Sequence, residues 1–260
     1  MTDPTGVNPW IRTPPLVIAH RGQSLTMPEQ TMVAYRAAIE LGAAMIEADV
    51  RRTLDGELVM LHDEDLGRTT DGRGPVAQVR FGDLRGVDAG AWFHPRHAGE
   101  RIPTLDELLD LADAARIPLC LEVKGESAAA RATIAVGVTQ RLADRGLLDR
   151  HVLASFDHDV LDAARRRHGE LGIAPDRLPE RGALTPQATV AQAIRIGAPI
   201  LQHHHADLSP EVVAAAHDAG VAVWAWPTTD PADIERSIAL GVDGVMGDDV
   251  PALVTAVRAA

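Results

Sequence analysis

The segment Ala44-Met45-Ile46-Glu47-Ala48-Asp49-Val50 is an apolar run that carries two carboxylates at alternate positions. Its pattern predicts a β-strand, and side chains two residues apart on a strand point to the same face. Glu47 and Asp49 are therefore expected to point together, and such a pair of hard oxygen ligands suits Mg²⁺ or Ca²⁺. About a helix earlier, the apolar run Leu16-Val17-Ile18 leads into His20 and Arg21. Together these features indicate metal-assisted chemistry on an anion.

Further apolar runs alternate with segments of helical period along the chain. The apolar runs predict strands over residues 16–19, 44–50, 118–123, 151–155, 171–174, 199–203, 221–225 and 243–246. The segments between and after them predict helices over residues 30–41, 104–115, 128–146, 158–168, 186–196, 209–219, 230–239 and 251–259. Strict alternation favours a parallel sheet with helical crossovers, and eight such units favour a closed (β/α)₈ TIM barrel over an open sheet.

One irregularity follows the second predicted strand. Asp55-Gly56 is a hairpin signal, so residues 57–61 are predicted to return as an antiparallel strand outside the barrel. This return would place His62 beside Asp49. Residues 63–103 lack a clear helical period and are interpreted as an insertion at the C-terminal face, typical of a lid or small subdomain. The expected organisation is a loose tail over residues 1–15 and one barrel domain over 16–260.

Composition limits the partners and the compartment. The formal net charge of −12 disfavours nucleic acid and anionic membranes as main partners, although local cations still allow a small anionic substrate. The single cysteine, Cys120, lies in an apolar run and is interpreted as a buried thiol. No apolar stretch approaches the roughly 18 residues of a membrane span. Residues 1–15 resemble no secretory signal, so a cytoplasmic protein is expected. The oligomeric state is not indicated.

Glu122 supplies a third carboxylate at a predicted strand end. It forms a second alternate-position pair with Lys124, and charged residues in an apolar run need a partner or a metal. With Glu47 and Asp49, Glu122 would complete a three-carboxylate site for Mg²⁺ or Ca²⁺ on neighbouring strands. The alternative is a buried salt-bridge network.

His20 and His62 come from different segments but are predicted to flank the same site. Hydrolysis of a phosphodiester needs a base to activate the nucleophile and an acid to protonate the leaving alkoxide, and two imidazoles can share these roles near neutral pH. Arg21 offers a bidentate fork and Lys124 a point charge to neutralise the phosphate.

Aromatic residues lie near the ends of two later predicted strands. Phe156 and Trp224, the latter together with Trp226, can line the pocket for an apolar or glycerol part of the substrate, or can pack against helices instead. The run His203-His204-His205 is a weak candidate for a metal site, because side chains alternate across a strand and at most two can face one way.

In combination, these motifs resemble the glycerophosphodiester phosphodiesterase family. The resemblance spans residues 16 to 250, and its specificity comes from the order and spacing of the elements. They are His20-Arg21-Gly22, Pro28-Glu29-Gln30-Thr31, Glu47-Ala48-Asp49, Thr53-Leu54-Asp55-Gly56, His62-Asp63 with Arg68-Thr69-Thr70, Ile102-Pro103-Thr104-Leu105, Glu122-Val123-Lys124, Trp224 and Gly241-Val242-Asp243-Gly244.

The resemblance implies a (β/α)₈ barrel with an insertion after the hairpin, and hydrolysis of glycerophosphodiesters to glycerol 3-phosphate and an alcohol with a divalent cation. It implies that a neighbouring glycerol hydroxyl attacks first and gives a cyclic phosphate, which water then opens. The implied acid and base are His20 and His62. The implied metal ligands are Glu47, Asp49 and Glu122, and the implied phosphate contacts are Arg21 and Lys124.

Two departures from the family pattern stand out. Gln30 replaces the usual Asn and is expected to shift a contact near the metal, and residues 245–249 replace two aliphatics, Thr and Asp, which is expected to loosen the rim of the last strand. Two other functions stay open: a lysophospholipase D-like or sphingomyelinase D-like activity on a lipid, which would need an apolar groove, and a non-catalytic glycerophosphodiester-binding barrel. The alcohol and the choice between Mg²⁺ and Ca²⁺ also stay open.

Overall fold

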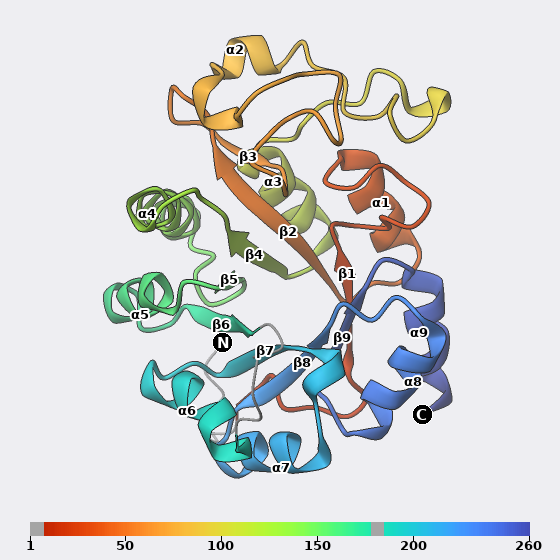
Figure 1. Cartoon of the computed structure of the whole chain (residues 1–260), viewed down its shortest axis with the longest axis vertical. Helices are drawn as coiled ribbons and strands as arrows, with labels where there is room; N and C mark the ends of the chain where they lie inside the picture. Colours follow the sequence, from red (N-terminus) through yellow and green to blue (C-terminus); the bar gives the residue numbers. More distant parts are fainter. Residues whose placement is uncertain (1–7, 178–184) are drawn as a thin grey trace.

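Eight parallel strands form a closed barrel in the computed structural model, which describes residues 8–177 and 185–260 (Figure 1). The strands are β1 (Leu16–His20), β2 (Met45–Arg52), β4 (Leu119–Val123), β5 (Val152–Ser155), β6 (Gly172–Arg177), β7 (Ile200–His204), β8 (Ala222–Trp226) and β9 (Gly244–Gly247). Their order is β1-β9-β8-β7-β6-β5-β4-β2, and the pairing of β1 with β2, with His20 opposite Glu47, closes the ring. The predicted (β/α)₈ barrel is confirmed.

A polar N-cap residue sets the start of each barrel helix. These helices are α1 (Met32–Glu40), α3 (Leu105–Ala115), α4 (Ala128–Asp144), α5 (His158–Arg167), α6 (Pro186–Arg195), α7 (Pro210–Asp218), α8 (Pro231–Ala239) and α9 (Val250–Ala259). Each has a Ser, Thr or Asp N-cap whose side chain accepts a hydrogen bond from a backbone N–H of the first turn. At α3, Thr104 and Glu107 form the complete capping box that the sequence predicts.

Alternation along each strand divides the apolar residues into two layers. One layer packs between the strands and the helices, and includes Val17, Ala19, Ile46 and Ala48. The other fills the inside of the barrel, with Ile18, Met45, Cys120, Val152, Ala154, Ala174, Ile200, Ala222, Trp224 and Met246 among its members. Because Met45 points inward, Glu47 and Asp49 also point inward, nearer the C-terminal end of β2. The strand period therefore delivers both carboxylates to the mouth of the barrel.

The N-terminal segment departs from the loose tail expected for residues 1–15. Residues 1–7 lie outside the described residues, but residues 8–12 close the opposite end of the barrel. Asn8 Nδ2 donates hydrogen bonds to the carbonyl oxygens of Pro199 at 2.6 Å and Gly220 at 2.9 Å. The Trp10 ring packs edge-on against Trp224, with a centroid separation of 5.5 Å. The apolar surface of Trp10 and Ile11 is what binds this segment to the barrel interior.

The hairpin after β2 forms as predicted. Strand β3 (Leu58–Met60) is antiparallel to β2, with Met60 opposite Val50. The insertion then carries the 3-10 turns η1 (Val76–Gln78) and η2 (Pro95–His97) and the short helix α2 (Phe81–Leu84), and it stands beyond the end of β2 (Figure 1). It has a small core of its own, formed by Val59, Leu61, Leu66, Val76, Leu84, Ala89 and Ile102. Among the described helices, none is long and apolar enough to cross a membrane.

Candidate active site

Three buried carboxylates meet at the mouth of the barrel. Glu47 and Asp49 lie on β2, and the β2–β4 register places Glu122 opposite Asp49. One oxygen from each carboxylate lies within 4.8 Å of the others, and the side chains are almost fully buried. Burial, with repulsion from Asp49 and Glu122, raises the pKa of Glu47 well above its usual range. Burial also raises the pKa of Glu122 to about 7. A cation bound among these carboxylates would therefore be stabilised by their negative charge.

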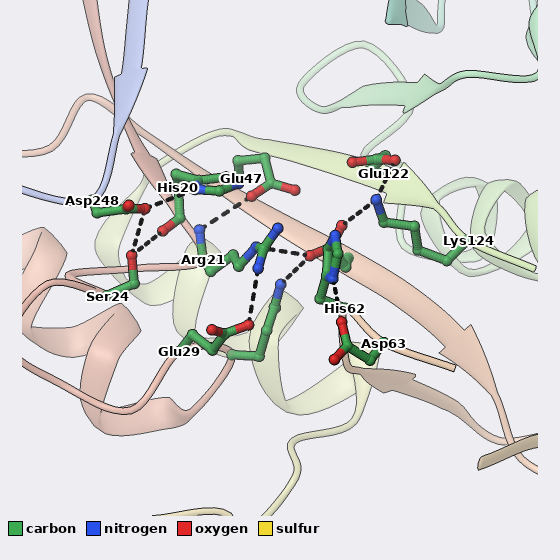
Figure 2. A network of polar contacts seen from close by, with 12 residues as sticks. His20, Arg21, Ser24, Glu29, Glu47, His62, Asp63, Glu122, Lys124 and Asp248 are labelled. Atoms are coloured by element: carbon green, nitrogen blue, oxygen red, sulfur yellow. Dashed lines mark hydrogen bonds and ion pairs between the residues drawn. The ribbon is translucent and has the colours of Figure 1, made fainter. Parts of the chain in front are cut away.

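Two basic side chains meet the carboxylates from either side. Lys124 Nζ lies 3.1 Å from Asp49 Oδ1 and 2.5 Å from Glu122 Oε1. Arg21 Nε lies 3.3 Å from Asp49 Oδ2 (Figure 2). Although burial opposes ionisation of Asp49, Lys124 and Arg21 hold its pKa well below the usual range. Asp49 is thus ionised under ordinary conditions and is a candidate ligand for a cation.

A divalent cation fits this arrangement. Within the described part of the chain, Glu47 Oε1 is buried and has no hydrogen-bond partner. Such an oxygen is costly to bury unless something from outside binds it. Three carboxylates with one open oxygen form the hard donor set that Mg²⁺ and Ca²⁺ accept. The residues that the sequence predicts as ligands are the same three that the fold brings together.

Both predicted histidines line one cavity of about 270 Å³ together with Glu47 and Glu122. His20 Nδ1 lies 2.7 Å from Asp248 Oδ1, and His62 Nδ1 lies 2.6 Å from Asp63 Oδ1 (Figure 2). Because an ionised carboxylate only accepts hydrogen bonds, each Nδ1 carries the proton and each Nε2 remains for chemistry. Burial lowers the pKa of His62, although Asp49 opposes this effect.

The turn after β1 explains how His20 and Arg21 reach the site. Arg21 adopts a left-handed backbone conformation with φ of 58°, and its N–H donates to Glu47 Oε2 at 3.1 Å. Gly22 follows with φ of 87°, and a Cβ there would lie 2.7 Å from the backbone of Ala34. The turn therefore needs glycine so that it can approach α1 closely.

Gln30 supports Asp49 from behind. Its Nε2 donates to Asp49 Oδ2 at 2.6 Å, and its Oε1 accepts from the Tyr35 hydroxyl at 2.5 Å. Gln30, where the family pattern has Asn, thus contacts a candidate metal ligand directly. The longer amide lies between a candidate ligand and a buried phenol. The sequence analysis had assigned no role to Tyr35.

A second group of supporting residues orders the outer edge of the site. Arg68 pairs with Glu29 at 2.8 Å and with Asp63, and Glu29 in turn pairs with Arg21 at 3.0 Å. These contacts link the insertion to the turn after β1. Through Arg68 and Glu29, they connect Asp63, which contacts His62, with Arg21, which contacts Asp49.

Two aromatic predictions have different outcomes. Phe156 is 42% exposed, lines the cavity and lies 5.6 Å from the Trp226 ring. Trp224 is fully buried and lies deeper, where a Cβ on Gly244 would lie 2.6 Å from its ring. Trp226, and not Trp224, is among the described residues that line the cavity. The spacing of the two tryptophans predicts their shared face but not their depth, and the tryptophan at the cavity is Trp226 rather than the predicted Trp224.

The histidine run forms no metal cluster within the described residues, where the carboxylate triad alone has that geometry. The ring of His205 stacks on His204 at 4.8 Å and lies 3.3 Å from Asp233. The rim of β9 packs closely against Thr228. A Cβ on Gly247 would lie 2.1 Å from the Thr228 carbonyl oxygen, and the Thr228 N–H donates to Met246 at 2.7 Å.

Several site residues were missed by sequence reasoning. Asp176, Gln202 and Met246 line the cavity, and Asp248 orients His20. The strand predicted over residues 171–174 stops two residues short of Asp176, whereas β6 continues to Arg177. Asp176 lies two residues after Ala174, and this alternate spacing was the signal that it shares a strand face with Ala174.

Comparisons with known proteins agree with this geometry. The model of the glycerophosphoryl diester phosphodiesterase family matches residues 20–252. A glycerophosphodiester phosphodiesterase of Caldanaerobacter subterraneus subsp. tengcongensis is 35% identical over 249 residues, covering 94% of this chain and 98% of the relative.

Solved structures give the same result. A phosphodiesterase of Oleispira antarctica in complex with the product sn-glycerol-3-phosphate has a TM-score of 0.84 at 26% identity, covering 94% of this chain and 97% of that one. A glycerophosphodiester phosphodiesterase of Agrobacterium tumefaciens has a TM-score of 0.78 at 26% identity, covering 93% and 99%. The chain therefore belongs to the glycerophosphoryl diester phosphodiesterase family.

Proposed function

We propose that this protein hydrolyses glycerophosphodiesters to glycerol 3-phosphate and an alcohol, with a divalent cation held by Glu47, Asp49 and Glu122. The observation that carries the proposal is the cavity that Glu47 and Glu122 share with His20, His62, Arg21 and Lys124, with Asp49 beside them in the carboxylate cluster. The sn-glycerol-3-phosphate bound to the Oleispira antarctica relative supports the choice of substrate.

Arg21 and Lys124 provide the positive charge for the phosphate. Lys124 spans Asp49 and Glu122, and Arg21 approaches Asp49 from the turn after β1. A phosphate in the cavity would meet both cations at once, which favours charge-assisted hydrogen bonds to its oxygens. The bound Mg²⁺ or Ca²⁺ would add Lewis-acid stabilisation of charge on the phosphate.

His20 and His62 exchange protons with the substrate through their Nε2 atoms. One imidazole accepts the proton of the neighbouring glycerol hydroxyl as that oxygen bonds to phosphorus, and the other protonates the alkoxide as its bond to phosphorus breaks. Water then opens the resulting cyclic phosphate, and the two histidines reverse their roles. Asp248 and Asp63 keep the two rings in the tautomer and orientation that this exchange needs.

The groove next to the cavity favours a polar alcohol over a lipid. Its volume is about 830 Å³ and it shares Glu122, Lys124 and Phe156 with the cavity. Its side chains are mainly charged or polar, including Arg51, Arg131, Asp157, His158, Asp159, Arg177, Gln192 and Arg195. An acyl chain would have to desolvate these groups without pairing them, which is unfavourable.

The proposal is tested with His20→Ala and Glu47→Gln. Release of glycerol 3-phosphate from glycerophosphocholine should fall by at least about 10²-fold in either variant, because proton transfer or cation binding is lost. EDTA should abolish the activity of the unaltered protein. His168→Ala, at the C-terminal end of α5, is the matched histidine control.

Circular dichroism would establish that each variant is folded. Activity that survives EDTA, or that survives both substitutions, contradicts the proposal. Lysophosphatidylcholine in the same assay separates the lipid alternative, and faster turnover of that substrate would favour it.

A further inference from the structure

One buried carboxyl group in the cavity has no role in the chemistry above. Asp176, on β6, is 2% exposed, and β6 lies two strands from β4 around the barrel. We propose that Asp176, oriented by Gln202, binds a hydroxyl group of the substrate and so contributes to substrate specificity. This inference rests on the proposed function, because it concerns the substrate of the same cavity.

The orientation of Asp176 is set by a chain of polar contacts. Gln202 Nε2, on β7, donates to Asp176 Oδ1 at 2.5 Å. The other end of that amide, Gln202 Oε1, accepts a hydrogen bond from Cys120 Sγ at 3.5 Å. These contacts assign the amide orientation and keep one carboxyl oxygen of Asp176 engaged.

The other oxygen, Asp176 Oδ2, is available to a ligand. It is buried and has no hydrogen-bond partner in the described part of the chain. Leaving such an oxygen unsatisfied is unfavourable, so a donor from a ligand would stabilise it. Asp176 lines both the 270 Å³ cavity and the 830 Å³ groove, so it lies where the two spaces meet. A substrate that occupies the cavity can therefore reach it.

A potential donor lines the same cavity. Trp226 Nε1 is also buried without a partner among the described residues. A hydroxyl can donate to Asp176 Oδ2 and accept from an indole N–H, whereas a quaternary ammonium group can do neither. A phosphate group would bring negative charge against the carboxyl. The unsatisfied polar atoms of the residues that line this cavity thus favour a hydroxyl over the charged parts of the substrate.

The hydroxyl has two sources: the glycerol half that all glycerophosphodiesters share, or the leaving alcohol. Three substrates distinguish them. Glycerophosphocholine has hydroxyls only in its glycerol half, and glycerophosphoglycerol has them in both halves. The third, 2-hydroxypropyl phosphocholine, keeps the hydroxyl next to the phosphate ester but lacks the terminal one.

The variant is Asp176→Asn, which keeps the shape of the side chain. Because Gln202 Nε2 donates to one position, the Asn carbonyl should turn toward Gln202 and its NH₂ toward the cavity. Where the Asp176 carboxyl is ionised, its cavity-facing acceptor then becomes a donor. The control is Asp243→Asn, a buried carboxyl at the opposite end of the barrel that accepts from the N–H of Val223 and of Arg12.

If the hydroxyl is the terminal one of the glycerol half, Asp176→Asn should lower kcat/KM about 10- to 100-fold for both glycerophosphodiesters and leave the deoxy substrate unchanged. If it belongs to the alcohol, glycerophosphoglycerol alone should lose activity. Asp243→Asn should leave the ratios among the three substrates unchanged.

An equal change for all three substrates, or no change, overturns the inference. Thermal unfolding of Asp176→Asn shows whether an equal loss reflects a damaged fold. Failure of the unaltered protein to turn over any of the three substrates overturns the proposed function itself, and this inference with it.

Discussion

Replacing Tyr35 with Phe removes a single oxygen atom from the chain of contacts that supports Asp49. The Tyr35 hydroxyl donates to Gln30 Oε1 at 2.5 Å, and Gln30 Nε2 donates to Asp49 Oδ2 at 2.6 Å. Tyr35 is fully buried, so water cannot replace the lost donor. Burial raises the pKa of Tyr35 well above its usual range, and the phenol therefore stays a donor at any ordinary pH.

The expected effect has two parts. Phe fills the same space apart from the oxygen, so no cavity of consequence forms, but Gln30 Oε1 loses its partner in a buried place. The free energy of unfolding should fall by about 1–3 kcal/mol. Gln30 is then free to turn its amide, and Asp49 loses an orienting donor. Loss of such support around a metal ligand weakens metal affinity by roughly 10- to 100-fold.

Urea unfolding and calorimetric titration of Ca²⁺ or Mg²⁺ measure these two quantities. Ser237→Ala is the matched control, because Ser237 is fully buried and its hydroxyl has no partner among the described residues. Removal of that hydroxyl should not destabilise the protein. A Tyr35→Phe variant with unaltered stability and unaltered cation affinity would refute the reasoning.

Two further predictions concern pH and the closed end of the barrel. Burial raises the pKa of Glu122 to about 7, and a cation binds its ionised form, so cation affinity should weaken as pH falls below this value, approaching about tenfold per pH unit for this group. Calorimetric titrations between pH 8 and 5.5 check this, and a constant affinity contradicts it. Trp10→Ala should lower the free energy of unfolding by roughly 1–3 kcal/mol, because the ring packs on Trp224. Its kcat/KM should not change, since Trp10 enters the barrel from the end opposite the site. Chemical unfolding with parallel kinetics tests both parts.

The sequence by itself determined the barrel and the central residues of the candidate site. Strand and helix periods are local, so eight alternating units could be recognised without knowledge of long-range contacts. The same local period places Glu47 and Asp49 on one face, and the Asp55-Gly56 turn predicts that His62 returns beside them. These features survive in the structure because backbone geometry over a few residues is sufficient to produce them.

The supporting residues depended on the tertiary structure. Asp248 reaches His20 from the last strand–helix connection, Gln30 reaches Asp49 through a turn, and Asp176 reaches the cavity because β6 extends further than predicted. The depths of Trp224 and Trp226 follow from how the strands are staggered in the closed barrel.

The N-terminal segment makes the same point at the other end of the molecule. A Pro-rich stretch indicates a loose tail when taken alone, yet Asn8 and Trp10 find partners more than 190 residues away in sequence. Sequence periodicity specifies which face of an element a residue occupies. Its partner across the barrel is set by closure of the sheet, which brings together residues that no local pattern connects.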